Sequence, residues 1–135
     1  MKTLNPYIDF SGKCREALEF YKQCLNGEIV MVQTFGEAPV NAEEKDKSRI
    51  MHSEFKAEGV HFMASDGMPG RKAKAGDNIS LTIHFTNEKE QEKVFKALAE
   101  GGKVTQPLED TFWGARFGML VDGYGIHWML NCMKQ

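Results

Sequence analysis

The chain has 135 residues, 41% of them hydrophobic and 27% charged, which is the composition of one globular domain with a core that needs no disulfides. Its formal net charge of -2 and the lack of a long basic stripe argue against nucleic acid as a partner. No run is long and apolar enough to span a bilayer, and the amino-terminal residues lack the apolar core of a secretory signal, so we expect a cytoplasmic protein without a membrane partner.

The first half of the chain predicts a strand, a helix and three further strands. Residues 5–10 alternate polar and apolar side chains, which is typical of a strand with two unlike faces. Apolar residues then recur at helical spacing from Lys13 to Leu25, after a possible cap at Ser11 or Gly12. Three segments rich in β-branched and aromatic residues predict the other strands: 28–35, 49–55 and 60–65. The polar residues 36–48 predict a solvated loop with one helical turn at most.

The second half repeats this order of elements. Residues 78–85 alternate polar and apolar side chains more clearly than any other segment. Asn87 followed by Glu90 fits a capping box at the start of a helix from Glu88 to Glu100. Three strands follow: 103–108, 115–121 and 125–132. The glycine-rich, basic residues 67–77 are expected to form a crossover between the halves.

The two halves also resemble each other in sequence. Residues 59–63 (Gly-Val-His-Phe-Met) recur 66 positions later as residues 125–129 (Gly-Ile-His-Trp-Met). The opening strand and helix recur with an offset of 75, because the first half has the longer central loop. Repetition over this length indicates a duplicated module. We therefore predict a single α+β domain of two βαβββ modules, at about residues 4–66 and 78–132.

The eight strands are expected to form one cupped mixed sheet, with both helices on its convex side and a concave trough on the other. Strand alternation decides which residues face each side. In the second module the apolar set is expected under the helix: Ile79, Leu81, Ile83 and Phe85. The polar residues of both opening strands are then expected to face the trough: Asn5, Tyr7, Asp9, Asn78, Ser80, Thr82 and His84.

The three cysteines indicate neither a metal site nor a disulfide. Cys14, Cys24 and Cys132 form no CxxC or Cys-His cluster. Cys14 and Cys24 lie on one predicted helix at a separation of about 15 Å, which is beyond disulfide reach. We interpret all three as reduced, buried residues.

Several segments together resemble a known superfamily. They are residues 6–10 (Pro-Tyr-Ile-Asp-Phe), 17–21 (Ala-Leu-Glu-Phe-Tyr), 51–54 (Met-His-Ser-Glu), 63–66 (Met-Ala-Ser-Asp) and 111–118 (Thr-Phe-Trp-Gly-Ala-Arg-Phe-Gly). With the duplicated βαβββ plan, they are similar to the vicinal oxygen chelate superfamily of glyoxalase I, bleomycin-resistance proteins, fosfomycin-resistance enzymes and extradiol dioxygenases. Within it, they resemble the PhnB-like subgroup, often labelled as relatives of 3-demethylubiquinone methyltransferase.

In the metal-using members, the resemblance implies a divalent ion held by His, Gln or Glu from the first strand of each module and by Glu from the last. This chain has Met63 and Met129 on its last strands, and thioethers are poor ligands for such ions. The first strands offer other unsuitable residues: Asn5 or Tyr7, and Ser80 or Thr82. No glycine-rich turn that could cradle a methyl donor follows the first strand. We therefore predict no metal, no cofactor and no glyoxalase activity, and the same departures argue against dioxygenase and fosfomycin-transferase activity.

The leading hypothesis is a metal-independent homodimer that binds a small, mostly apolar molecule in the trough. It either sequesters this molecule or acts on it by an unidentified route. The side chains expected to contact this ligand are Tyr7, His52, Met63, His84, Trp113, Arg116 and Met129. No catalytic residue is predicted. Arg116 is expected to repeat the position of His52 and to meet an anionic group, or else to pair with Glu54 or Asp110.

Two other interpretations stay open. His61 and His127 share the strand parity of the two methionines, so a His-based metal site with help from neighbouring strands would make the chain a metal-dependent lyase or transferase of the glyoxalase or fosfomycin-resistance type. The neighbouring candidates are His52, Glu54 and His84. A purely structural dimer module, with the trough filled by side chains, is the third interpretation.

Overall fold

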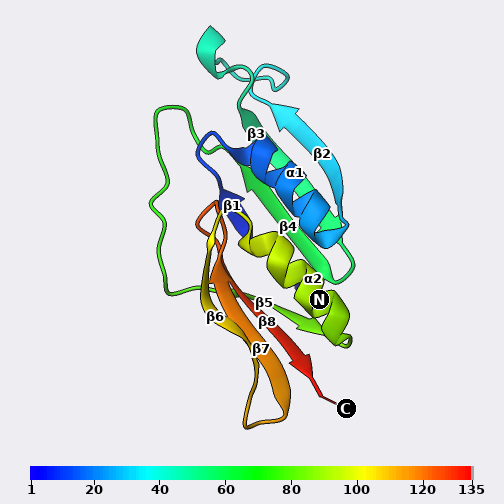
Figure 1. The fold of residues 1–135 in the computed structure, drawn as a ribbon. Coiled ribbons are helices and arrows are strands. Elements are labelled where there is room, and N and C mark those ends of the chain that lie inside the picture. Colours follow the sequence, from blue (N-terminus) through cyan, green and yellow to red (C-terminus); the bar gives the residue numbers. More distant parts are fainter. Residues whose placement is uncertain (135) are drawn as a thin grey trace. The chain divides into compact units, whose positions relative to one another are not determined.

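The computed structural model describes residues 1–134, and within them it contains two helices and eight strands (Figure 1). The elements in order are β1 (Tyr7–Asp9), α1 (Cys14–Leu25), β2 (Glu28–Thr34), a short 3-10 helix (Glu44–Asp46), β3 (Ile50–Ala57), β4 (Val60–Ser65), β5 (Leu81–Phe85), α2 (Glu88–Ala99), β6 (Lys103–Asp110), β7 (Ala115–Val121) and β8 (His127–Met133). They divide into two compact units, module 1 from Met1 to Lys74 and module 2 from Ala75 onwards. The α+β class with two βαβββ modules is confirmed.

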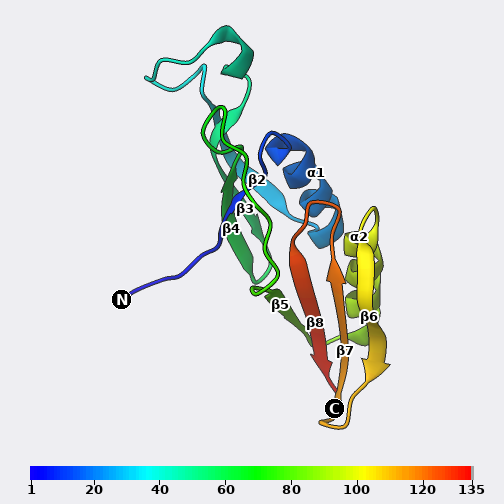
Figure 2. The same ribbon diagram turned by 90° about the vertical axis from the view of Figure 1, so that its left-hand side faces the viewer.

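Module 1 is a four-stranded mixed sheet with α1 against one face (Figure 2). The strand order is β1-β4-β3-β2, in which β1 and β4 are parallel and the other pairs are antiparallel. Aromatic rings fill the space between helix and sheet: Phe55 stacks on Phe62 at 4.8 Å, and Tyr21 meets Phe62 edge-on at 5.7 Å. Because these three side chains are at most 1% exposed, they fix the buried face of the sheet.

Module 2 repeats this architecture with its own sheet and helix. The strand order is β5-β8-β7-β6, again with the first pair parallel and the others antiparallel. Beneath α2 lie the fully buried Leu98, Leu120 and Leu130. The eight predicted strands therefore occur as two four-stranded sheets, one in each module.

The sequence repeat is reproduced in the strand register. Tyr7 is paired with Met63 between β1 and β4, and Thr82 is paired with Met129 between β5 and β8. The equivalence of the two methionines, expected from the offset repeat, is thus correct. The helices begin 74 residues apart, at Cys14 and Glu88, one position fewer than the offset seen in sequence.

The two helices are capped in different ways. Asn87 accepts a hydrogen bond from the Glu90 backbone N–H at 2.9 Å, which confirms the predicted cap of α2. Neither Ser11 nor Gly12 is the N-cap of α1. Lys13 is the N-cap residue and makes no side-chain cap, and the carboxylate of Asp66 accepts from the Cys14 N–H instead. The local sequence contains no sign of this distant partner.

Several boundaries are shorter than the alternation predicts. β5 begins at Leu81, so Ile79 lies before the strand and is 75% exposed rather than buried under α2. β1 covers only Tyr7–Asp9. All three cysteines are buried and outside any disulfide, as predicted. In residues 1–134, no helix is both long and apolar enough to cross a membrane.

Candidate functional site

The face of each sheet opposite its helix is called here the open face. In module 1, Ser53, Phe55, Phe62 and Ala64 are buried on the helix side, so the alternate residues of β3 and β4 point to the open face. These alternate residues are His52, Glu54, His61 and Met63, and Tyr7 joins them through its pairing with Met63. Three residues predicted to bind ligand therefore share one face: Tyr7, His52 and Met63.

Tyr7 and His52 form a polar pair on this face. The Tyr7 hydroxyl lies 3.0 Å from His52 Nδ1, and the two rings are stacked with centroids 5.6 Å apart. Tyr7 is 51% exposed, so the pair is accessible from outside the module. If the hydroxyl donates to Nδ1, then the single N–H of the neutral ring is on Nε2 and can donate to a ligand. If Nδ1 donates, the hydroxyl proton and the Nε2 lone pair are both available to a ligand.

A second polar group on the open face of module 1 is held by its own internal bonds. His61 Nε2 lies 2.6 Å from Glu54 Oε2, and His61 Nδ1 lies 3.4 Å from the side-chain amide of Asn5. Lys56 adds a longer ion pair to the same carboxylate, at 3.9 Å. Both ring nitrogens of His61 are therefore engaged, so His61 on β4 braces β3 and the segment just before β1.

The open face of module 2 is more apolar. One row across β5, β8 and β7 consists of Thr82, Met129 and Met119, and the next consists of His84, Asn131 and Phe117. Trp113, in the turn before β7, meets Phe117 with ring centroids 5.9 Å apart and is 49% exposed. Three more of the predicted ligand residues thus belong to one face: His84, Trp113 and Met129.

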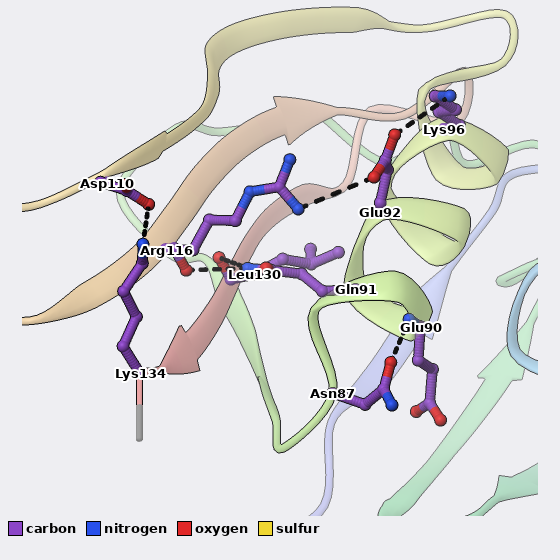
Figure 3. Close-up of polar contacts among 9 residues, drawn as sticks. All are labelled: Asn87, Glu90, Gln91, Glu92, Lys96, Asp110, Arg116, Leu130 and Lys134. Carbon is purple, nitrogen blue, oxygen red and sulfur yellow. Dashed lines mark hydrogen bonds and ion pairs between the residues drawn. The ribbon is translucent and has the colours of Figure 1, made fainter.

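Arg116 is not on that face. Its partner across the ladder is Cys132, which is 1% exposed beneath α2, and Gly118 and Leu120 follow on the same buried side. The guanidinium extends to Glu92 on α2, with Nη1 3.9 Å from Oε2, rather than to Glu54 or Asp110 (Figure 3). From the sequence we expected Arg116 to occupy the position in module 2 that His52 occupies in module 1, and this prediction was wrong by one residue. Ser53 pairs with Ala64 as Gly118 pairs with Leu130, so the equivalent of His52 is Phe117.

The nitrogen and oxygen ligands that a metal ion would need do not converge on the open face of module 1. Among residues 1–134, no group of three or more His, Cys, Asp or Glu side chains is arranged to hold a metal ion. Glu54 and His61 bind each other, and His52 binds Tyr7. The available donors are therefore poorly suited to a divalent ion, which needs several ligands directed at one point.

Sequence reasoning missed two features of these faces. The Glu54–His61 brace is one, although strand parity placed both residues on the same side and could have indicated it. The other is the position of Arg116 beside α2, which no local pattern reveals because it depends on the register of β7 against β8.

A family model for 3-demethylubiquinone-9 3-methyltransferase matches residues 2–131. This chain belongs to that family. Protein YjdN from Escherichia coli is 31% identical over 98% of this chain and 96% of its own length. The family's fold is also seen in the crystal structure of protein PA1353 from Pseudomonas aeruginosa, which has 38% identity, a TM-score of 0.89 and full coverage of both chains.

A third relative connects the chain to the PhnB-like subgroup. A Bacillus cereus protein, described as PhnB and as a putative 3-demethylubiquinone-9 3-methyltransferase, is 28% identical with a TM-score of 0.80 over 97% of this chain and 99% of its own. Fosfomycin-resistance proteins also match, at identities that show the fold alone. The resemblance to the PhnB-like subgroup is thereby confirmed, and its fold is also that of a fosfomycin-resistance protein.

Proposed function

We propose that this family member binds a small, mostly apolar molecule with one polar handle, without a metal ion, and that the polar handle meets the Tyr7–His52 pair. The observation that supports this is the 3.0 Å contact between the Tyr7 hydroxyl and His52 Nδ1 on an accessible face. A buried tyrosine or histidine commonly completes its hydrogen bonds inside the protein, whereas this pair leaves donor and acceptor capacity directed outward.

The surroundings of the pair suit an apolar ligand. Met63 lies beside Tyr7 in the sheet and presents a flexible, polarizable thioether. Considered by itself, the open face of module 2 has the same character, with apolar surface from Met129, Met119 and the ring of Trp113 and a polar group in His84. Clefts that bind small molecules commonly combine such apolar walls with a few polar groups.

Metal independence is part of the proposal. Met63 and Met129 stand at equivalent register positions on β4 and β8, so neither module offers a carboxylate there.

The family's description names a methyl transfer. The loop from Phe10 to Lys13 after β1 is held by Asp9 and leads into α1, and its two residues at positive φ are Ser11 and Gly12. It is not the glycine-rich cradle of a nucleotide-like methyl donor, so we propose binding rather than methyl transfer.

We also propose that the chain is a homodimer in solution. The edge strand β2 exposes Val30 and Met31, which are 42% and 38% accessible. Uncovered edge strands with apolar side chains commonly pair with another chain.

The proposal is tested by thermal unfolding of the protein against a metabolite library, in parallel with Tyr7→Phe and Tyr124→Phe variants. A ligand of the open face raises the melting temperature of the wild type and of Tyr124→Phe but not, or much less, that of Tyr7→Phe. Tyr124 lies in the turn before β8, so the control removes the same hydroxyl elsewhere. Equal stabilisation of all three proteins by every hit would refute the assignment of the Tyr7–His52 pair.

A further inference from the structure

Module 2 contains a groove on the helix side of its sheet, away from the open face. It runs between α2 and the edge strand β6 and has a volume of about 630 Å³. Its apolar walls come from Phe95 and Ala99 on the helix and from Val104 and Leu108 on the strand. Val104 is 40% exposed, so the groove is reached from outside the module.

The groove exists because β6 does not pair regularly with β7. Gln106 is paired with Met119 and Glu109 with Phe117, so two residues, Pro107 and Leu108, stand opposite the single Gly118. This is a bulge, and the proline has no N–H to give to the ladder. Gly118 also has no room for a side chain. A Cβ there would lie 2.8 Å from the Phe95 ring and 2.9 Å from Leu108.

Module 1 serves as an internal comparison. Counting from the starts of the helices, the position of Glu92 on α2 corresponds to Leu18 on α1, which is 1% exposed. The position of Arg116 corresponds to Met51, because Gly118 and Ser53 hold equivalent places in their ladders. An ion pair in module 2 thus replaces two apolar residues in module 1. Module 1 has the same fold without this ion pair, so the Glu92–Arg116 pair is a feature of module 2 that the fold does not require.

At one end of the groove, the ion pair of Arg116 is a long one. Glu92 is shared by two cations, with Lys96 Nζ at 3.3 Å from Oε1 and Arg116 Nη1 at 3.9 Å from Oε2 (Figure 3). The second distance is too long for a hydrogen bond, so Arg116 and Glu92 are ion-paired without being hydrogen-bonded to each other. Glu100 also lines the groove, and it lies four residues after Lys96, about 6 Å along the axis.

A nearby ion pair does not change this balance. Lys134 Nζ contacts Asp110 Oδ1 at 2.8 Å, so those two charges largely cancel. The charged residues that line the groove balance, with the cations Lys96 and Arg116 against the carboxylates Glu92 and Glu100. Arg116 lies at the end from which an apolar channel runs between Phe95 and Leu108.

We propose that this groove is a second binding site, specific for a carboxylic acid with an alkyl or aryl body. Arg116 holds the carboxylate through two N–H donors, Lys96 assists, and the apolar body lies along Phe95, Ala99 and Val104. The site is independent of the open faces, so it stands or falls separately from the proposed function.

The test is titration calorimetry with octanoate, with 1-octanol and octylamine as matched probes. Octanoate binds the wild type with one site per chain, and the alcohol and the amine bind much more weakly. Arg116→Gln weakens octanoate binding about tenfold or more, because a charge-assisted contact is lost. Glu92→Gln strengthens it roughly threefold, because the competing carboxylate is gone. Lys93→Gln, the same charge change on an exposed, non-lining neighbour, has little effect.

A measurement on the wild type guards against variants that fail to fold. Octanoate shifts the methyl NMR signals of Ala99, Val104 and Leu108 and leaves that of Met63 unchanged. The proposal is overturned by unchanged signals in the groove, by weaker binding in Glu92→Gln, or by loss of binding in Tyr7→Phe. It is also overturned if octanoate does not bind and Arg116→Gln instead dissociates an oligomer, because a second copy would then cover the groove.

Discussion

Asp66 caps helix α1 through the backbone N–H of Cys14, at 2.8 Å and across a separation of 52 residues. Its other carboxylate oxygen accepts from the Ile50 N–H at 2.7 Å, and its own N–H donates to the Ile50 carbonyl. One side chain that is only 4% exposed therefore joins the start of α1, the start of β3 and the end of β4.

Replacing Asp66 with Ala is expected to destabilise the protein by about 3 kcal/mol, because two buried N–H groups lose a charged acceptor. Urea unfolding measures the loss. Asp77→Ala, at an exposed position in the crossover, is the matched control and should change stability by less than about 0.5 kcal/mol. Equal effects in the two variants would contradict the role given to Asp66.

Gln91 is expected to stabilise module 2 as Asp66 stabilises module 1, through two hydrogen bonds between a buried side chain and the backbone. It is fully buried, and its amide donates to the carbonyls of Arg116 at 2.8 Å and Leu130 at 3.1 Å (Figure 3). Gln91→Met is expected to cost about 2 kcal/mol, because it keeps the length of the side chain and removes both donors. Gln23→Met on the exposed side of α1 is the control in the same unfolding assay. A neutral Gln91→Met would contradict a net stabilising role for this amide, whose Oε1 is buried without a hydrogen-bond partner among the described residues.

The thiol of Cys14 gives a pH prediction. Burial raises the pKa of this thiol from 9.0 to about 12, against the weaker effect of its contact with Ser53. The unfolded chain therefore loses this proton above about pH 9 while the folded chain keeps it. Stability is unaffected by the thiol below that pH and falls by about 1.4 kcal/mol per pH unit between the two values.

The measurement is urea unfolding at pH 8, 9, 10 and 10.5 for the wild type and Cys14→Ala. The wild type should lose stability more steeply than the variant above pH 9, and the two slopes should agree below it. Parallel slopes over the whole range would show that the thiol ionises as readily in the folded chain as in the unfolded one.

Met63→Glu is expected to raise the affinity for Zn²⁺ about tenfold or more. The new carboxylate would lie in the sheet between Tyr7 and Glu54, on the face that also carries His52 and His61. Competition with a chelating dye measures the affinity, and Met68→Glu, in the exposed crossover, is the control.

The wild type should retain no stoichiometric metal after dialysis against a weak chelator. About one zinc or manganese ion per chain would mean that the histidines are ligands after all.

Light scattering at micromolar concentration is expected to give twice the chain mass of 15.3 kDa. Val30→Lys with Met31→Lys places two charges on the edge strand β2 and should shift the mass toward that of one chain. Val40→Lys changes an exposed loop residue of similar accessibility and should leave the mass unchanged. A wild-type mass near 15 kDa would contradict the dimer.

The elements were predictable because their signals are local. Alternation and helical spacing located all eight strands and both helices, and the offset repeat placed Met63 and Met129 at equivalent positions before any coordinates were known. The α2 cap was predictable from Asn87 and Glu90 alone, since both partners lie within one turn.

The contacts that decide the candidate sites were not predictable in the same way. Arg116 was assigned to the wrong face because a shift of one residue in register moves a side chain across the sheet. The cap at Asp66 and the groove beside β6 depend on long-range pairing and on a bulge at Pro107, neither of which leaves a periodic trace.

Each end of the crossover is attached to its own module. The Ala73 N–H donates to Ser11 Oγ at 2.8 Å in module 1, whereas Ala75 lies 3.8 Å from where a Cβ on Gly125 would be in module 2. In the described residues, no strand is paired across this boundary. A cut after Lys74 would therefore remove no hydrogen bond from either sheet. The gene could be divided at this point into two parts, each of which encodes a complete four-stranded sheet and its covering helix.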